Sequence, residues 1–113
     1  MNLRELQAEC YQVAKDKGWH DEDESPPSIV RAMTWMALLH SEVSEAVEDI
    51  RKGHLETKVR PDGKPEGLGS ELADVIIRAL DTATAMGFDM ESEIALKMAF
   101  NKTRTHRHGG KLV

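Results

Sequence analysis

Two segments of this chain place apolar residues at helical spacing and set acids at the edge of the apolar face, a pattern that constrains the fold more than any other feature. In the first segment, an apolar stripe lies beside a stripe that begins apolar and becomes acidic. The apolar stripe is Met36, Leu39, Val43, Ala46 and Ile50, and its neighbour is Trp35, Leu38, Glu42, Glu45 and Asp49. Because an apolar stripe has to face a core, these acids lie at the shoulder of a buried surface.

The second segment repeats this arrangement. One of its stripes is wholly polar and consists of Glu71, Asp74, Arg78 and Asp81. Its apolar residues cover an arc of roughly 200° at 3.6 residues per turn. Each segment therefore carries two acids three residues apart, whose Cβ atoms lie about 5–6 Å from each other on one helix face. Two carboxylates at this separation can share a cation.

The two acidic pairs predict a metal site made of Glu42, Glu45, Glu71 and Asp74. Four carboxylates that converge in a helical bundle repel one another and raise each other's pKa unless a cation lies between them. Ligands that are all oxygen atoms suit a hard ion, so we expect Mg²⁺, with Mn²⁺ able to replace it. The alternative is that each acidic stripe is simply the solvated face of an amphipathic helix.

The composition indicates one all-α domain that spans residues 1–113. The core segments contain Leu, Ile, Val, Met and Ala with few aromatic residues, as is typical of packed helices. A single cysteine, Cys10, excludes an intramolecular disulfide framework and fits a reducing compartment. No apolar run is long enough to span a membrane, and we expect a cytoplasmic protein without a membrane partner.

Capping and helix-breaking residues divide the chain into four helices. We expect these helices over about residues 3–17, 28–52, 70–87 and 89–104. Asn2 with Glu5 forms a capping box, and Ser28 and Asp89 are expected N-caps. The helical pattern fails over residues 53–69, where a short hairpin can form. The prediction is a four-helix bundle with a long loop between helices two and three.

The apolar arcs of helices two and three are wider than one core layer needs. We therefore expect at least a homodimer, with a twofold interface built from these two helices.

The charge of the chain is unevenly distributed. All 20 acids lie at or before Glu93, and five bases follow it: Lys97, Lys102, Arg104, Arg107 and Lys111. An acidic body argues against nucleic-acid binding, whereas a basic end beside an acidic metal site suits a substrate that carries phosphate. The residues Lys97, Asn101 and Arg104 share one helix face and can act together. Alternatively they are a solvated helix end with favourable dipole placement.

The order of these motifs resembles that of a known family. Glu42-x-x-Glu45, followed after a gap by Glu71-Leu72-Ala73-Asp74, resembles the metal motif of the MazG-like nucleotide pyrophosphohydrolases, in the all-α NTP pyrophosphatase superfamily. The acids here are preceded by Ser41 and Ser70, where many members carry a further acid.

The basic motif of the same family has a counterpart at the end of the chain. It is Lys97-x-x-x-Asn101-x-x-Arg104, with His108-Gly109-Gly110-Lys111 behind it. The resemblance extends from residue 18 to residue 111 and depends on the ordered set of motifs.

The resemblance implies an Mg²⁺-dependent enzyme that cleaves a nucleoside triphosphate, ribose or deoxyribose, to the monophosphate and pyrophosphate, a house-cleaning of the nucleotide pool. It also implies a MazG-like bundle that assembles as a homodimer or a homotetramer. On this basis we expect Glu42, Glu45 and Lys97 to be catalytic residues, with Lys97 and Arg104 stabilising charge on the leaving pyrophosphate. The expected substrate-binding residues in the basic part are Lys97, Asn101, Arg104 and Lys111.

Two tryptophans are candidates for recognition of the nucleotide base. Trp19 follows a glycine in a loop and can stack on a base, and Trp35 shares the acidic stripe and can line a base pocket. For both residues the alternative is packing in the core. Among the other polar residues, we expect Arg78 to form a salt bridge with Asp74 or Asp81.

Two further expectations bear on the site. Asp81 is a candidate to orient Lys97, and His20 is expected at the surface or the core edge. Two other functions stay open: a phosphoribosyl-ATP pyrophosphohydrolase, and a non-catalytic helical interaction protein with a degenerate acidic site.

Overall fold

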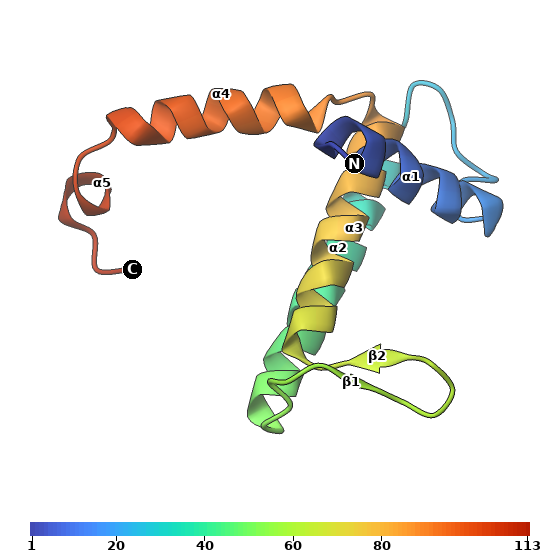
Figure 1. The fold of residues 1–113 in the computed structure, drawn as a ribbon. Coiled ribbons are helices and arrows are strands. Elements are labelled where there is room, and N and C mark those ends of the chain that lie inside the picture. Colours follow the sequence, from blue (N-terminus) through green and yellow to red (C-terminus); the bar gives the residue numbers. More distant parts are fainter.

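Five helices and one small hairpin make up the chain in the computed structural model, which describes residues 1–113 (Figure 1). In chain order they are α1 (Leu3–Asp16), α2 (Ile29–Arg51), β1 (Lys58–Val59), β2 (Pro65–Glu66), α3 (Leu68–Met86), α4 (Met90–Thr103) and α5 (Arg107–Gly110). The predicted all-α class is therefore confirmed. None of these helices is both long and apolar enough to cross a membrane.

The starts of the helices follow the caps expected from the sequence, with one exception. The Asn2 side chain accepts a hydrogen bond from the Glu5 amide at 2.9 Å, and Ser28 Oγ accepts one from the Arg31 amide at 3.0 Å. Asp89 precedes α4 as expected but caps none of its amides. Its carboxylate instead accepts hydrogen bonds from the guanidinium of Arg4, because α1 passes beside the start of α4.

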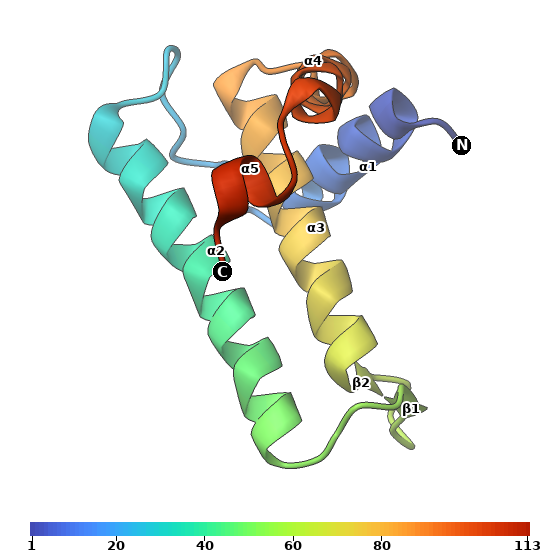
Figure 2. The ribbon, with the colours of Figure 1, turned by 90° about the vertical axis from the view of Figure 1, so that its left-hand side faces the viewer.

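Helix α3 is the central element of the fold. It contacts α2, which runs antiparallel to it, and α1, which crosses it near one end (Figure 2). Few side chains become buried in this arrangement: nine of the 113 residues are buried and no side chain is fully enclosed. The small core joins the three helices through Cys10 of α1, Trp35 and Ala46 of α2, and Leu80 and Ala83 of α3.

The expected loop between α2 and α3 contains a short antiparallel hairpin, in which Lys58 pairs with Glu66. Gly67 closes this segment onto the start of α3 with a φ of 114°. A Cβ atom at Gly67 would lie 2.4 Å from the carbonyl oxygen of Glu56, so only glycine fits there. The Leu68 amide donates to the carbonyl of His54, and α3 begins two residues before the expected position. The loop thereby fixes the start of the helix that carries Glu71.

Helix α4 leaves the body formed by α1, α2 and α3 (Figure 1). Within the chain it contacts α1. Arg4 binds Asp89 and Glu91 at its start, and the buried Gln7 side chain bridges the Phe88 carbonyl and the Met90 amide. Beyond this anchor, the apolar side chains of α4 are exposed: Ile94, Leu96, Met98 and Phe100.

The last helix is irregular, as expected from its paired glycines. His108 and Gly109 adopt left-handed backbone angles within α5, so residues 107–110 form a turn and no regular helix.

Candidate functional site

Three of the four predicted metal ligands meet where α2 and α3 lie side by side. One carboxylate oxygen from each of Glu42, Glu45 and Glu71 lies within 4.8 Å of the other two. Glu42 and Glu45 come from one face of α2, and Glu71 reaches them from the first turn of α3. The antiparallel arrangement of the helices thus brings together acids that are far apart in the sequence.

Asp74, the fourth predicted ligand, lies beside this trio on the next turn of α3 and is not part of it. Burial raises the pKa of the Asp74 carboxyl, and the negative charge of Glu42 raises it further. The positive charges of Arg78 and Lys64 act in the opposite direction. Asp74 therefore shares the electrostatic environment of Glu42, at the end of the cluster that is nearer to Arg78.

Two buried carboxylate oxygens of this cluster have no hydrogen-bond partner, Glu71 Oε2 and Asp49 Oδ2. Burial raises the pKa of Glu71, and so do the negative charges of Glu45, Asp49 and Asp74. Buried polar atoms are normally paired, and oxygen atoms without donors are what a hard divalent cation requires. The residues present therefore fit a metal ion of this kind.

Asp49 was part of the acidic stripe in the sequence but not of the predicted ligand set. Its place in the cluster depends on α3 lying opposite that turn of α2. The signal in the sequence was its spacing of four residues from Glu45.

Arg78 binds neither of the two residues expected from its own helix. Its Nε and Nη2 atoms donate to Glu42 Oε1 at 3.1 and 2.9 Å. The expected salt bridge to Asp74 or Asp81 is therefore wrong. The guanidinium reaches across the gap between the helices, where the carboxylate of Glu42 is only 13% exposed and has no other cation.

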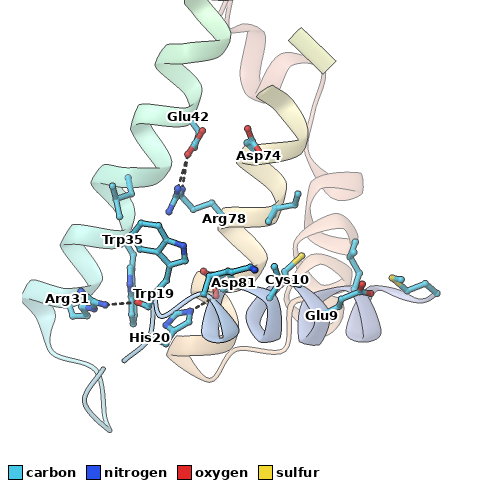
Figure 3. Close-up of a pocket in the computed structure, with 17 residues that line it drawn as sticks. Glu9, Cys10, Trp19, His20, Arg31, Trp35, Glu42, Asp74, Arg78 and Asp81 are labelled. Atoms are coloured by element: carbon cyan, nitrogen blue, oxygen red, sulfur yellow. Dashed lines mark hydrogen bonds and ion pairs between the residues drawn. The ribbon is translucent and has the colours of Figure 1, made fainter. Parts of the chain in front are cut away.

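A cavity of about 610 Å³ opens beside the carboxylates and extends between α1, α2 and α3 (Figure 3). Glu42 and Asp74 lie at one end of it. Much of its wall is apolar or aromatic and includes Cys10, Val13, Trp19, Trp35, Leu38 and Ile77. The volume falls in the range of about 300–1,000 Å³ that is typical of small-molecule sites.

Cys10 is a packing residue of this wall. Burial and the negative charge of Asp81 raise the pKa of its thiol, which disfavours the reactive thiolate.

The two tryptophans line this cavity in different ways. Trp35 is buried, with 6% of its surface exposed, and forms part of the wall between the carboxylates and the far end. Trp19 is 72% exposed at the rim, so core packing does not explain it. Both tryptophans therefore line one cavity that also reaches two of the predicted metal ligands.

A hydrogen-bonded network holds the loop that carries Trp19. His20 is buried, with Nε2 2.6 Å from Asp81 Oδ1 and Nδ1 bonded to Asp23. Of the two expected positions, the surface or the core edge, His20 occupies the core edge, where it lines the cavity. Asp81 binds this histidine and does not orient Lys97. Arg31 extends the network through Asp23 and the Trp19 carbonyl. The network ties the loop to α2 and α3.

Asp23 lies in a run of four acids, residues 21–24, and was not among the residues predicted from the sequence to support the site. The available signals were the histidine next to Trp19 and the isolated Asp81 on the polar stripe of α3.

The residues of the predicted basic motif lie elsewhere in the chain. Lys97 and Asn101 are exposed on α4, Arg104 and Lys111 are exposed beyond it, and none of the four lines the cavity. Arg104 lies over the ring of Phe100, 5.8 Å from its centre. One chain alone therefore does not bring these four residues to the carboxylates.

Comparison with known proteins identifies the family. A model of the MazG nucleotide pyrophosphohydrolase domain matches residues 31–108, which include the carboxylate cluster, Trp35 and Arg78. The chain belongs to this family. As a MazG family member it is a hydrolase that acts on the pyrophosphate bonds of nucleotides, and the resemblance stated from the motifs is confirmed.

The fold of this MazG domain is similar to a solved structure. A crystal structure of iMazG from Vibrio DAT 722 superimposes with a TM-score of 0.61 at 27% sequence identity. The match covers 91% of this chain and 100% of the other. A search of curated proteins returned no match.

Proposed function

We propose that this MazG domain is an Mg²⁺-dependent nucleoside triphosphate pyrophosphohydrolase that releases pyrophosphate and leaves the ribo- or deoxyribonucleoside monophosphate. On this proposal, residues 1–113 are one functional domain. The observation that carries the proposal is a cluster of carboxylates that contains two unpaired buried oxygens and whose members Glu42 and Asp74 line one end of an aromatic-walled cavity. The carboxylate cluster suits a metal-bound triphosphate, and the cavity suits a nucleoside.

The carboxylates would hold the metal. Glu42, Glu45 and Glu71 supply three converging oxygens, with Asp74 and Asp49 at the two ends of the cluster. A bound Mg²⁺ supplies charge neutralisation for the triphosphate and a lower pKa for a coordinated water. Because Glu71 and Asp49 each have a buried oxygen without a donor, holding these carboxylates together is electrostatically unfavourable, and a bound cation would relieve the repulsion.

The cavity would hold the nucleoside. A base in the cavity would stack on the exposed ring of Trp19, with Trp35 forming part of the wall beside it. The network of His20, Asp23 and Asp81 keeps the loop of Trp19 in place. A nucleoside in this position directs its phosphates toward Glu42 and Asp74.

A second copy of the chain would complete the site. The chain exposes 8805 Å², whereas a compact monomer of its mass exposes only about 6,200 Å². Its radius of gyration is 16.6 Å, compared with about 13 Å for a compact domain of this length. The excess area is of the size buried by obligate homodimers. Exposed apolar side chains on α2, α3 and α4 provide the surface for it.

In such a homodimer, or in a homotetramer made from it, α4 would pack on the partner. Its residues Lys97, Asn101 and Arg104, followed by Lys111, would then bind the phosphates at the partner's carboxylates. This arrangement explains why these residues are far from the acids of their own chain.

Pyrophosphate release from a panel of nucleotides tests the proposal. The panel contains the eight common nucleoside triphosphates and phosphoribosyl-ATP, each with and without Mg²⁺. We expect Mg²⁺-dependent release from at least one triphosphate. Glu45→Gln should lower this activity by about 100-fold or more because it removes a ligand. Glu48→Gln, on an exposed turn of the same helix, should have no effect.

Two results would contradict the proposal. Activity on phosphoribosyl-ATP alone would favour the other enzyme, and no release from any compound would favour a non-catalytic interaction protein.

A further inference from the structure

Arg78 occupies the boundary between the two parts of the site. Its guanidinium lies between the carboxylates of Glu42 and Asp74 and the aromatic part of the cavity (Figure 3). Both Nε and Nη2 donate to the single oxygen Glu42 Oε1. About a third of the Arg78 side chain remains exposed, and the residue lines the cavity.

The other basic residues of the cavity are placed differently. Lys17 and Arg31 also line it. Arg31 lies at the far end, where it binds Asp23 and the Trp19 carbonyl and stacks over Trp35. Among these cations, Arg78 is the one that contacts a predicted metal ligand.

The chemistry of a nucleotide defines what this boundary must bind. The α-phosphate joins the nucleoside to the rest of the phosphate chain. If the nucleoside occupies the cavity and the metal-bound phosphates lie at the carboxylates, the α-phosphate has to lie between them. A guanidinium binds phosphate through two parallel hydrogen bonds, so Arg78 offers a suitable partner at this position.

We propose that Arg78 is the α-phosphate-binding residue of this site and that its ion pair with Glu42 is the resting contact which metal binding breaks. The inference rests on the proposed function. A divalent cation at Glu42 would compete for the oxygen that Arg78 holds and would repel the guanidinium. Release from Glu42 leaves the guanidinium free for the phosphate. The contact with Glu42 thus keeps Arg78 ordered beside the position where it is needed.

A purely structural ion pair between α2 and α3 predicts a different behaviour. It would persist when metal binds, and its loss would reduce stability without changing the affinity for a phosphate. Binding measurements therefore separate the two roles without any use of catalytic activity.

The experiment uses Arg78→Gln and Arg78→Lys, with Arg51→Gln as the matched control. Arg51 is an exposed arginine near the end of α2, with 74% of its side chain exposed. Calorimetry on the nucleotide-free protein measures the affinity for Mg²⁺. Arg78→Gln should bind Mg²⁺ about 10-fold more tightly because the competing cation is gone. Arg51→Gln should match the wild type.

A second titration, at saturating Mg²⁺, compares the eight common nucleoside monophosphates with their nucleosides. Arg78→Gln should weaken monophosphate binding by about 10- to 100-fold and leave nucleoside binding unchanged. Arg78→Lys keeps the charge but loses the planar pair of donors. Its affinity for the monophosphates should therefore lie between those of the wild type and Arg78→Gln.

Unchanged Mg²⁺ and monophosphate affinities in a folded Arg78→Gln protein would overturn the inference, and pyrophosphate release by the wild type would leave the proposed function standing. If Arg78→Gln does not fold, wild-type monophosphate affinity in Arg78→Lys overturns it. Conversely, the expected binding changes in a protein that releases no pyrophosphate would support the role of Arg78 and contradict the proposed reaction.

Discussion

Glu71 differs from a solvated glutamate in two ways: its pKa is raised, mainly by burial, and its Oε2 atom lacks a partner. Glu42, in contrast, has a partner, because its carboxylate forms an ion pair with the guanidinium of Arg78. Replacing Glu42 with glutamine would therefore remove a partner of Arg78 as well as a repelling charge. Glu71 is the better residue with which to measure the repulsion within the metal-free cluster.

The metal-free Glu71→Gln protein should melt about 2–5 °C higher than the wild type at pH 7.5. Because the folded-state pKa of Glu71 is raised above its ordinary value of 4.5, its ionised form destabilises the fold above the folded-state pKa. This destabilisation disappears as the pH falls through the folded-state pKa toward 4.5. The advantage of the variant should therefore shrink as the pH falls from 7.5 toward 4.5.

Melting curves in EDTA and in Mg²⁺ measure this effect. In the wild type, Mg²⁺ at 100 times its Kd should stabilise the fold by about 2.7 kcal/mol. Glu71→Gln should reduce this gain. Equal melting temperatures for the two proteins in EDTA, with an equal Mg²⁺ shift, would mean that Glu71 is a solvated glutamate. The hydrogen bonds from Arg4 lower the pKa of Asp89, so the contribution of Asp89 to stability changes only below pH 3.8. This change does not overlap with the pH range in which Glu71 is tested.

At the scale of elements, the start of α3 depends on how the hairpin is attached. Gly67→Ala places a Cβ against the Glu56 carbonyl in a backbone conformation that favours glycine. We expect it to destabilise the protein by about 2–3 kcal/mol and to weaken Mg²⁺ binding, because Glu71 lies on the first turn of α3.

Gly63→Ala is the matched control for this prediction. Gly63 also has a positive φ, of 90°, but a Cβ there has open space around it. Gly63→Ala should destabilise the protein by only about 1 kcal/mol and leave its Mg²⁺ affinity unchanged. Chemical denaturation and calorimetry give both quantities. Equal effects of the two substitutions would show that the contact with Glu56 has no influence on the site.

At the scale of the whole molecule, the position of α4 requires an explanation that one chain does not provide. If α4 supplies Lys97 to a partner's carboxylates, two inactive variants should restore each other's activity. Coexpressed Glu45→Gln and Lys97→Ala chains should form mixed dimers in which one of the two sites is intact. Random mixing should recover about a quarter of the wild-type activity.

Light scattering at micromolar concentration should give a mass of at least a dimer. No recovery in proven mixed dimers would place Lys97 and Glu45 of each site in the same chain, and a monomeric mass in Mg²⁺ would contradict the assembly itself.

The sequence alone determined the main helices, the caps of α1 and α2 and the shoulder position of the acids. These features depend on local spacing: residues three or four apart on a helix must share a face, and Asn2 or Ser28 can bond only to amides nearby. The family likewise followed from the order of short motifs.

Contacts across helices were decided by the tertiary structure. Arg78 binds Glu42, and neither Asp74 nor Asp81, because α2 and α3 pack at a distance that the guanidinium can span. The same packing buried Asp49 Oδ2, and the folded loop enclosed His20. Side chains 36 or 61 residues apart in sequence meet only when the backbone between them is folded, and no local pattern encodes that distance.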